Sequence, residues 1–397
     1  MNNDSGTRMG FDCIANTYAR FPITIQRGQG VFVWDEQGKK YVDFTSGIAV
    51  CSLGHCHPQI VEAVKTQADR LFHISNLYWT EPQAKLARLL CENSFGEKVF
   101  FCNSGAEAVE AAIKLARKFG HETRGPDCYE IICLRGSFHG RTLAAITATG
   151  QPVYQRGFEP LVDGFTHVPP NSIHALELAA GERTAAILLE PILGEGGVIP
   201  LETAFLQAAR DIADRIGALV IFDEIQTGMG RTGNLFAHEH AGVTPDVMCL
   251  AKALANGLPI GATVAKDEVM AHLGPGTHAS TFGGNPLCCA AAIKVMEILT
   301  ETDILERVRQ QGSYLKKRLE ELSRWWPDIR EVRGRGLMVA VEFQRPFPDL
   351  ASHLIEKGIL AIVPQGRLLR LLPPFLIEKE HIDMLLTALD EFRQRSS

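Results

Sequence analysis

The sequence predicts an α/β protein: a mostly parallel sheet covered by helices on both faces, followed by a smaller α+β domain. From about residue 95 to 265, short continuous apolar runs alternate with helical patterns. Such alternation is typical of parallel strands that are buried on both faces. After about residue 290, a long helical stretch leads to short strands and a closing helix. The 397 residues are enough for two domains.

The elements can be taken in chain order. Residues 11–50 contain alternating VFVW and YVDF around the turn DEQGKK, which predicts a hairpin. Continuous apolar runs predict the main strands at 98–103, 130–136, 185–191, 218–224 and 246–251. Helical patterns between them include 106–120 and 203–217, and both end in Gly.

These elements predict three parts of the chain. An N-terminal segment, residues 1–50, is expected to pack with the small domain. A large domain is expected over residues 51–290 and a small C-terminal domain over 291–397. The small domain should contain strands at LMVAVEF, ILAIV and LLRLL.

Composition and charge argue against several classes of protein. The formal net charge is −6 and no basic stripe is visible, which argues against nucleic-acid binding. The polar start MNNDSGTRMG does not resemble a signal peptide, and the apolar runs are too short to span a membrane. The ten Cys lack paired spacing, as expected for reduced thiols in a cytoplasmic protein.

Two charged residues stand at the ends of successive predicted strands. Asp223 ends ALVIFD, and Lys252 follows DVMCLA. Burying a carboxylate or an amine is costly unless the group is paired or used. Pyridoxal phosphate (PLP) needs both groups, because a lysine forms its Schiff base and an acid keeps its pyridine nitrogen protonated. The pair therefore indicates PLP as the cofactor.

A third predicted strand leads into a tight turn and a helix, FFCNSGAEAVEAA. Ser104 and Glu107 have the spacing of a capping box, which by itself predicts only a well-capped helix. Gly105 and Ala106 keep the turn free of bulky side chains. Free amides at such a helix start are suited to a phosphate group.

Two more loops after strands carry residues suited to a ligand. In SFHGRT, Phe138 is suited to stacking on a planar ring and Arg141 to binding a carboxylate. In EPILGEGG, Glu190 and Glu195 are 195 − 190 = 5 residues apart. Paired carboxylates also occur in glycosidases. Taken singly, these residues fit a core Phe, a surface Arg and loop carboxylates better than a ligand site.

Three further motifs suggest other chemistry. VIFDE resembles the acidic strand of P-loop ATPases, but G-x-x-x-x-G-K-[ST] is absent, since Gly38-Lys39 is followed by Lys40. GMGRTG (228–233) matches G-x-G-x-x-G, the nicotinamide-binding pattern, but comes late and is separated from its strand by DEIQT. CSLGHCHP (51–58) fits no standard zinc spacing.

The motifs together resemble a known family. The order SGAEA, SFHGRT, LEPILGEGG, FDEIQTGMGRTG, AKALANGLPIGA and STFGGNP is similar to the class III, PLP-dependent aminotransferases of fold type I. The resemblance runs from about residue 20 to the C-terminus and is greatest to the acetylornithine aminotransferases. The spacing 252 − 223 = 29 is that of the family. The resemblance implies a mostly parallel, seven-stranded type of sheet in the large domain.

The resemblance also implies roles at the cofactor. Lys252 would hold PLP covalently and move a proton at the substrate carbon, and Asp223 would bind the pyridine nitrogen. The other implied cofactor ligands are Ser104, Gly105 and Ala106 for the phosphate, Phe138 for the ring face, Gln226 for the phenolic oxygen, and Thr281 for the phosphate of the partner subunit. The role of Thr281 implies a homodimer with shared active sites.

Further residues are implied in substrate binding. Arg370 would bind the α-carboxylate of glutamate, and Arg141 the second carboxylate of glutamate or the α-carboxylate of acetylornithine. Ser280 is placed in the same site. Glu195 would act as a gate that pairs with Arg370 for an ω-amine donor and releases it for glutamate, because an unpaired buried Arg would penalise the uncharged donor. Ser75 and Asn76 match a segment near the active site.

The implied reaction is that of N-acetylornithine with 2-oxoglutarate, which gives N-acetylglutamate 5-semialdehyde and glutamate in arginine biosynthesis. Ornithine, succinylornithine, 4-aminobutyrate and succinyldiaminopimelate aminotransferases share the mechanism and are the alternatives. Val109, Trp79 and Ile192-Leu193 depart from the usual family residues. The last of these departures lies beside the gate residue Glu195 and bears on substrate preference more than on reaction type. From other classes, a nicotinamide-dependent dehydrogenase and a non-catalytic scaffold stay open.

Overall fold

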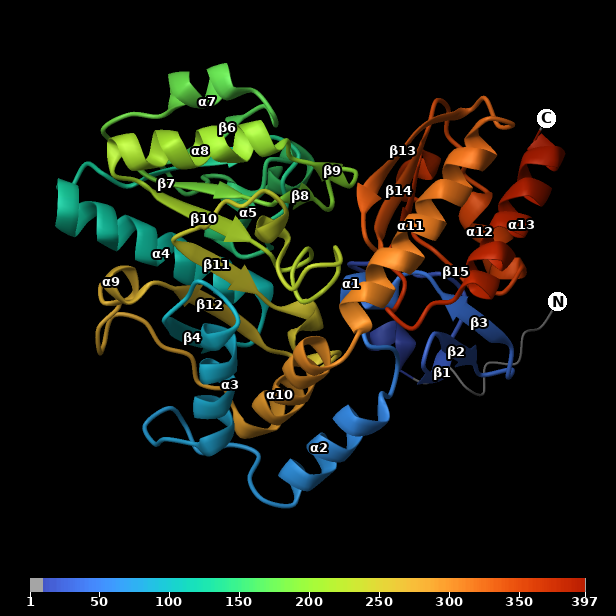
Figure 1. Ribbon diagram of the computed structural model, residues 1–397, viewed down its shortest axis with the longest axis horizontal. Helices are drawn as coiled ribbons and strands as arrows, with labels where there is room; N and C mark the ends of the chain where they lie inside the picture. The colour runs from blue at the N-terminus through green and yellow to red at the C-terminus, as the bar shows by residue number, and fades with distance from the viewer. Residues whose placement is uncertain (1–9, 397) are drawn as a thin grey trace.

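The larger of two lobes contains a seven-stranded sheet (Figure 1). The structure is a computed structural model that describes residues 10–396. The sheet has the order β4-β12-β11-β10-β7-β5-β6. Its strands are β4 (Lys98–Cys102), β5 (Glu130–Leu134), β6 (Phe165–Val168), β7 (Thr184–Leu189), β10 (Leu219–Asp223), β11 (Val247–Leu250) and β12 (Gly261–Ala265). Only β12 runs antiparallel to its neighbours, β11 and β4, so the prediction of a mostly parallel sheet is confirmed.

Two strands of this sheet are not predicted by the sequence. β12 has the sequence GATVA, whose small residues do not form a recognisable apolar run, yet all five are buried. β6 has the sequence FTHV and is only partly buried. Both strands depend on pairing with their neighbours rather than on a local pattern of their own.

Helices cover both faces of the sheet (Figure 1). α4 (Gly105–Arg124) packs against β7, β11 and β12, and α8 (Thr203–Ile216) packs against β7 and β10. Successive side chains of a strand point to opposite faces. Accordingly, Ala186 and Leu188 of β7 join the core cluster under α4, whereas Ile187 and Leu189 join the cluster under α8.

The end of α4 differs from the prediction. The expected stop, Gly120, lies inside the helix, which continues to Arg124. A Cβ atom on Gly120 would lie 2.3 Å from the carbonyl oxygen of Cys128, so this glycine allows close packing instead of ending the helix. By contrast, Gly217 follows α8 in the left-handed conformation, as the sequence predicts.

Further elements complete the larger lobe and its connections. They are α1 (Ser46–Ala49), α2 (Pro58–Ala68), α3 (Glu81–Glu92), α5 (Leu143–Ala148), α6 (Pro152–Gln155), α7 (Ile173–Ala179), β8 (Ile192–Leu193), β9 (Ile199–Pro200), η2 (Ala237–His240), η3 (Lys252–Ala255), α9 (Asp267–Met270) and α10 (Pro286–Glu301). α10 packs on α2 and α3. A short segment at Phe11–Cys13, η1, precedes all of them.

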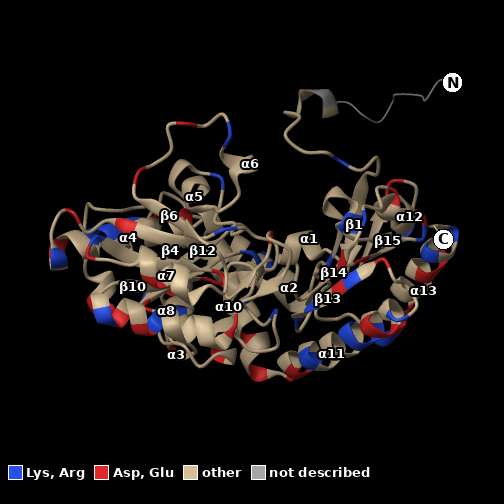
Figure 2. Ribbon diagram, turned by 90° about the horizontal axis from the view of Figure 1, so that it is seen from above, with Lys and Arg blue, Asp and Glu red and all other residues tan. Residues whose placement is uncertain are grey.

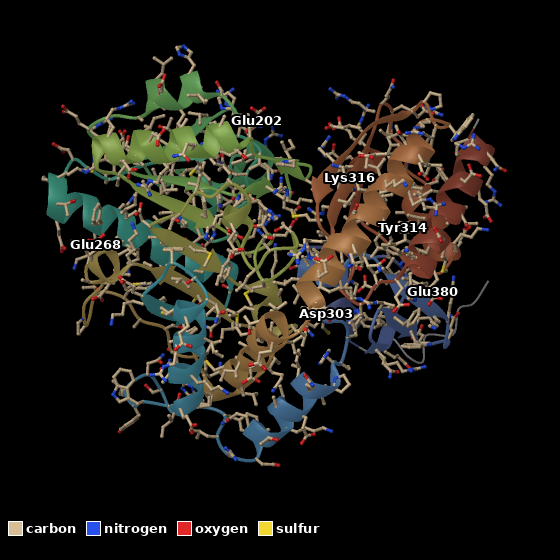
Figure 3. The ribbon with its side chains drawn as sticks, in the orientation of Figure 1. Glu202, Glu268, Asp303, Tyr314, Lys316 and Glu380 are labelled. Carbon is tan, nitrogen blue, oxygen red and sulfur yellow. The ribbon has the colours of Figure 1, made fainter. Side chains whose placement is uncertain are left out.

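The smaller lobe contains a second, antiparallel sheet of order β13-β14-β16. Its elements are α11 (Ile304–Ser323), β13 (Ile329–Arg335), β14 (Met338–Phe343), α12 (Leu350–Glu356), β15 (Ile359–Leu360), η4 (Pro364–Gly366), β16 (Leu368–Leu371) and α13 (Lys379–Ser396). Figure 3 labels Asp303, which lies between α10 and α11 where the chain passes from one lobe to the other. The domain limits stay a prediction, and α10 spans the limit placed at 290/291.

The N-terminal segment lies on the smaller lobe (Figure 1). β1 (Ile25–Gln29), β2 (Phe32–Asp35) and β3 (Lys40–Asp43) form an antiparallel ribbon, which confirms the predicted hairpin. β15, from the C-terminal part of the chain, pairs in parallel with β3 and completes a four-stranded sheet. Main-chain hydrogen bonds therefore join the N-terminal segment to the C-terminal part of the chain.

A buried arginine connects the lobes. Arg231 is 0% exposed and donates hydrogen bonds to the carbonyls of Leu337 (3.0 Å) and Pro373 (2.6 Å) and to Ser52 Oγ (2.7 Å). Within the described residues no carboxylate forms an ion pair with it, and burial lowers its pKa to about 9. Arg231 belongs to the loop that follows Asp223. Its hydrogen bonds therefore fix the position of the smaller lobe relative to that loop.

The glycines of GMGRTG serve this packing rather than a phosphate. A Cβ atom on Gly230 would lie 2.9 Å from Leu305, and one on Gly233 would lie 2.6 Å from Arg309, both on α11. The motif leads into a turn and not into a helix that opens a βαβ unit. This placement argues against nicotinamide binding at the motif.

Charge is mixed over the surface. Figure 2 shows Lys and Arg interspersed with Asp and Glu along α11 and α13. Within residues 10–396, no helix combines the length and the apolar character that crossing a membrane requires.

Candidate active site

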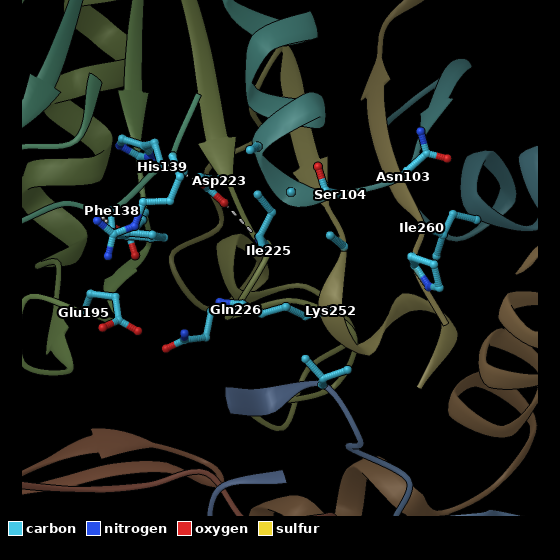
Figure 4. A pocket seen from close by; sticks show the side chains of 18 of the residues that line it. Asn103, Ser104, Phe138, His139, Glu195, Asp223, Ile225, Gln226, Lys252 and Ile260 are labelled. Carbon is cyan, nitrogen blue, oxygen red and sulfur yellow. Dashed lines mark hydrogen bonds and ion pairs between the residues drawn. The ribbon is translucent and has the colours of Figure 1, made fainter. Parts of the chain in front are cut away.

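A cavity of about 410 Å³ opens where β10 and β11 end, and it is lined by the loops that follow several strands of the sheet (Figure 4). Ligand sites in such sheets lie at the carboxyl ends of the strands. Ten residues singled out from the sequence line it: Ser104, Gly105, Ala106, Phe138, Arg141, Glu190, Glu195, Asp223, Gln226 and Lys252. Arg370, Ser280 and Thr281 are not part of the lining.

Asp223 ends β10 and is 4% exposed. One oxygen, Oδ2, lies 2.8 Å from Nδ1 of His139, and Oδ1 accepts a hydrogen bond from the amide of Ile225 at 3.1 Å. The carboxylate is thus oriented from two sides. No role is predicted for His139 from the sequence, although it stands in SFHGRT between Phe138 and Arg141. Its contact with Asp223 spans 84 residues, and no local pattern reveals it.

Lys252 begins η3, directly after β11. β10 and β11 pair in parallel with Asp223 opposite Cys249, so both strands deliver a charged residue to the same edge of the sheet. Lys252 has φ 45°, a backbone conformation that costs about 1–3 kcal/mol and is typical of functional sites. In the described part of the chain its ammonium has no hydrogen bond or ion pair.

The environment of Lys252 favours its neutral form. Burial lowers the pKa of Lys252 below its usual value, although the carboxylates of Glu195 and Asp223 oppose the shift. A neutral amine can act as a nucleophile or accept a proton, whereas an ammonium cannot. The geometry therefore provides an unengaged amine that faces the cavity (Figure 4).

The start of α4 offers a site for an anion. Ser104 Oγ accepts a hydrogen bond from the amide of Glu107 at 3.2 Å, which confirms the predicted cap. The Glu107 carboxylate, however, accepts from the amide of Asn103 and not from that of Ser104. Among residues 10–396, no group accepts a hydrogen bond from the amides of Gly105 or Ala106. These amides and the helix dipole are available to a phosphate group.

Two of the loops are shaped by close contacts. A Cβ atom on Gly105 would lie 2.8 Å from Ile225, and one on Gly194 would lie 2.3 Å from Oε1 of Gln226. This Gln226 oxygen is buried and has no hydrogen-bond partner in the described residues. The glycines therefore leave space for the side chains of Ile225 and Gln226 at the cavity wall.

Aromatic residues flank the cavity mouth. The Phe138 ring meets the ring of Tyr154 edge-on, with centroids 5.8 Å apart. Arg141 is exposed, and its guanidinium lies over the Tyr154 ring, 4.0 Å from the centroid. Arg141 is therefore held beside the cavity, and its N–H groups, which have no acceptor within residues 10–396, are available to a carboxylate.

An ion pair lies at one side of the cavity. Nη1 of Arg370, on β16 of the smaller lobe, lies 2.7 Å from Oε1 of Glu195. Arg370 is 3% exposed, and Glu195 is half-buried and lines the cavity. The structure thus brings together two residues that are 370 − 195 = 175 positions apart. At the level of sequence, only the family resemblance implies this pairing.

Ser280 and Thr281 lie in a loop outside the cavity lining. Ser280 Oγ accepts hydrogen bonds from Asn103 Nδ2 (3.1 Å) and from the amide of Gly283 (3.0 Å). Asn76 donates from its side-chain amide to the carbonyls of Ser280 and Gly283. Thr281 itself is exposed. The substrate role of Ser280 and the role of Thr281 in a partner subunit stay predictions.

A known protein family matches this chain over nearly its whole length. Residues 13–392 match the family described as Aminotransferase class-III. The chain belongs to the class III aminotransferases. This confirms the family predicted from the motif order and, with it, a transaminase activity.

Class III aminotransferases of known sequence resemble this chain over nearly its whole length. The acetylornithine aminotransferase of Caldanaerobacter subterraneus subsp. tengcongensis is 50% identical over 379 residues, which cover 95% of this chain and 96% of that protein. The acetylornithine aminotransferase of Methanocaldococcus jannaschii is 49% identical over 374 residues and 94% of each chain.

Solved structures of the family show the same fold. The ornithine aminotransferase of Toxoplasma gondii ME49 superimposes with a TM-score of 0.93 at 35% identity, covering 98% of this chain and 94% of that one. The N-acetylornithine aminotransferase of Stenotrophomonas maltophilia K279a gives a TM-score of 0.82 at 37% identity, covering 94% and 97%. The predicted fold type is therefore confirmed.

Proposed function

We propose that this class III aminotransferase uses PLP to transfer the terminal amino group of N-acetylornithine to 2-oxoglutarate, giving N-acetylglutamate 5-semialdehyde and glutamate. The observation that carries the proposal is the unengaged amine of Lys252 beside the buried carboxylate of Asp223 in one cavity. The choice of donor is supported by relatives described as acetylornithine aminotransferases at 46 to 50% identity.

The residues around the cavity fit PLP. The amides of Gly105 and Ala106 would hold its phosphate with Ser104 beside them, and Phe138 would stack on its ring. Gln226, whose buried Oε1 has no hydrogen-bond partner in residues 10–396, would bind the phenolic oxygen through its side-chain amide. When bound, PLP supplies an aldehyde that reacts with amines and a ring that accepts the electron pair left on the substrate carbon.

Lys252 and Asp223 would have different roles in the reaction. Asp223, oriented by His139 and by the amide of Ile225, would keep a proton on the ring nitrogen. Lys252 would hold the cofactor between turnovers, and its neutral amine would accept and return the proton at the substrate carbon. The lowered pKa of Lys252 suits both tasks.

The ion pair between Glu195 and Arg370 suits a site that must accept two kinds of amine. An ω-amine donor brings no carboxylate close to its reacting carbon, so Glu195 neutralises Arg370. Glutamate brings its α-carboxylate to the same place, and Glu195 would then move away from Arg370. Arg141 would bind the remaining carboxylate of either substrate.

A homodimer is part of the proposal. Thr281 is exposed, and the adjacent Phe282 packs against His73, with ring centroids 5.2 Å apart. Large apolar side chains are exposed in the segment before α3, among them Trp79 at 94%. Exposed apolar residues of this density favour an interface between subunits. Thr281 would then reach the phosphate in the partner's site.

The donor can be tested with single-turnover half-reactions of the PLP-loaded protein. The panel consists of N-acetylornithine, ornithine, N-succinylornithine, 4-aminobutyrate and N-succinyldiaminopimelate, with the loss of PLP absorbance as the signal. We expect N-acetylornithine to react with the highest kcat/KM. If kcat/KM for N-acetylornithine is no higher than for ornithine, the proposed donor is wrong. If the protein stays colourless after incubation with PLP, the proposed function is wrong.

Glu195→Gln should separate the two half-reactions. Without the carboxylate, buried Arg370 lacks its counter-charge when an ω-amine binds, so this half-reaction should slow about tenfold or more relative to the glutamate half-reaction. The ratio of the two single-turnover rates measures the effect. Glu202→Gln, at the start of α8 and outside the cavity (Figure 3), is the matched control. Equal slowing of both half-reactions would contradict the gate.

A further inference from the structure

Glu190 is a buried carboxylate that the proposed mechanism does not use. It follows β7, is 5% exposed and lines the cavity. Its two oxygens accept hydrogen bonds from two different loops: Oε1 from the amide of Phe138 at 2.8 Å, and Oε2 from the amide of Gly194 at 3.0 Å. One carboxylate therefore joins the loop after β5 to the turn between β8 and β9.

The second of these bonds fixes the residue directly before Glu195. The carbonyl of Gly194 also accepts a hydrogen bond from Arg370 Nη1 at 3.4 Å. On its Cα side there is no space, because a Cβ atom there would lie 2.3 Å from Gln226 Oε1. Gly194, directly before Glu195, is thus held by Glu190 at its N–H and contacted by Arg370 at its C=O.

The same turn is attached to the smaller lobe at its far end. Arg333 Nε donates to the carbonyl of Gly197 at 2.8 Å, and within the turn the amide of Val198 donates to the carbonyl of Gly194 at 3.3 Å. From the larger lobe, the Glu190 side chain holds the turn by accepting a hydrogen bond from the amide of Gly194. Removing that contact would leave the Glu195 end of the turn with only the two longer bonds to the Gly194 carbonyl, while Arg333 still holds the other end.

Burial makes this carboxylate costly to maintain. Burial raises the pKa of Glu190 to about 7, with His139 opposing and Asp223 reinforcing the shift. The free-energy cost of burying such an acid must be offset. Two hydrogen bonds from amides offset only part of this cost. Glu190 lies between the loop of Phe138 and the turn that carries Glu195, and this position indicates its role.

We propose that Glu190 is a positioning residue that holds Gly194 so that the adjacent Glu195 can pair with Arg370, and that it thereby sets the preference between ω-amine and glutamate. The inference rests on the proposed function, because it needs the gate. Glu190 acts through Glu195 and takes no proton from the substrate.

The first test uses Glu190→Gln in the PLP-loaded enzyme. Only one oxygen of the new side chain accepts hydrogen bonds, so one of the two amides loses its partner. We expect the ratio of ω-amine to glutamate single-turnover rates to fall about tenfold, with the PLP absorbance retained. Glu239→Gln is the matched control, because Glu239 also accepts a backbone amide, that of Phe236, but lies outside the cavity lining.

The second test repeats the measurement in a Glu195→Gln background. If Glu190 acts through Glu195, adding Glu190→Gln should leave the rate ratio unchanged there. A full tenfold effect in that background would overturn the inference, as would equal slowing of both half-reactions by the single variant. If Glu190→Gln is not recovered folded, Glu190→Asp, which keeps the charge but shortens the reach, should change the ratio in the same direction.

These outcomes are separate from failure of the proposed function. A wild-type protein without PLP absorbance or without either half-reaction would fail before any variant is made. A wild-type protein that performs both half-reactions, but in which Glu190→Gln leaves their ratio unchanged, would overturn only the positioning role.

Discussion

Lys252→Ala should reduce the rate of transamination by about 10⁴-fold or more, the upper end of what one positioned acid–base group contributes. The variant loses both the amine that holds the cofactor and the base that moves the proton. Other contacts remain, so PLP should still bind through the start of α4 and through Asp223. Steady-state kinetics and the visible spectrum of the purified protein measure the two losses.

Lys266→Ala is the matched control for this variant. Lys266 follows β12 in the same sheet, but it pairs with Asp246 at 3.0 Å and does not line the cavity. Its replacement should leave the spectrum and the rate nearly unchanged. If Lys252→Ala kept the wild-type spectrum and activity, the assignment of Lys252 would be wrong, because residues 10–396 contain no other lysine at the cavity.

Asp223→Asn should lower kcat by about 10²- to 10³-fold, as expected when a preorganised charge is removed from an active site. The side chain keeps its shape, and its amide can still contact His139. It cannot, however, stabilise a proton on the ring nitrogen, so the ring becomes a weaker acceptor of electrons. Rates measured at saturating PLP separate this effect from weaker cofactor binding.

Asp246→Asn distinguishes chemistry from stability. Asp246 is another buried carboxylate of the same sheet, and it pairs with Arg210 and Lys266 away from the cavity. Its loss should lower the melting temperature and leave kcat of the folded protein nearly unchanged. A kcat for Asp223→Asn within about threefold of wild type would contradict the role of Asp223, since one preorganised charge is worth far more.

Part of this protein could be predicted because the signal is local. Continuous apolar runs place five strands of the large sheet, since a strand buried on both faces has no polar positions. Asp223 and Lys252 are conspicuous because each follows such a run and would be costly to bury without a use. β12 and β13 have no comparable signal: one consists of small residues, and the other, IREVRGR, is largely polar.

Family resemblance added assignments that residue patterns do not carry. Thr281 and Ser280 have no local feature that indicates a phosphate or a substrate. The structure places them in a loop held by Asn76 and Asn103, outside the cavity lining. Their tests require the dimer, because the proposed contact of Thr281 is with another subunit.

The sequence by itself determined the class of fold and the paired groups at the ends of β10 and β11, because period, apolar content and strand ends are properties of neighbouring residues. Only the tertiary structure decided that His139 orients Asp223, that Arg231 joins the lobes and that Glu190 is bonded to the turn of Glu195. These contacts connect residues far apart in the chain. Which side chains meet there depends on how the strands are ordered and how the lobes pack, and neither is encoded in any short segment.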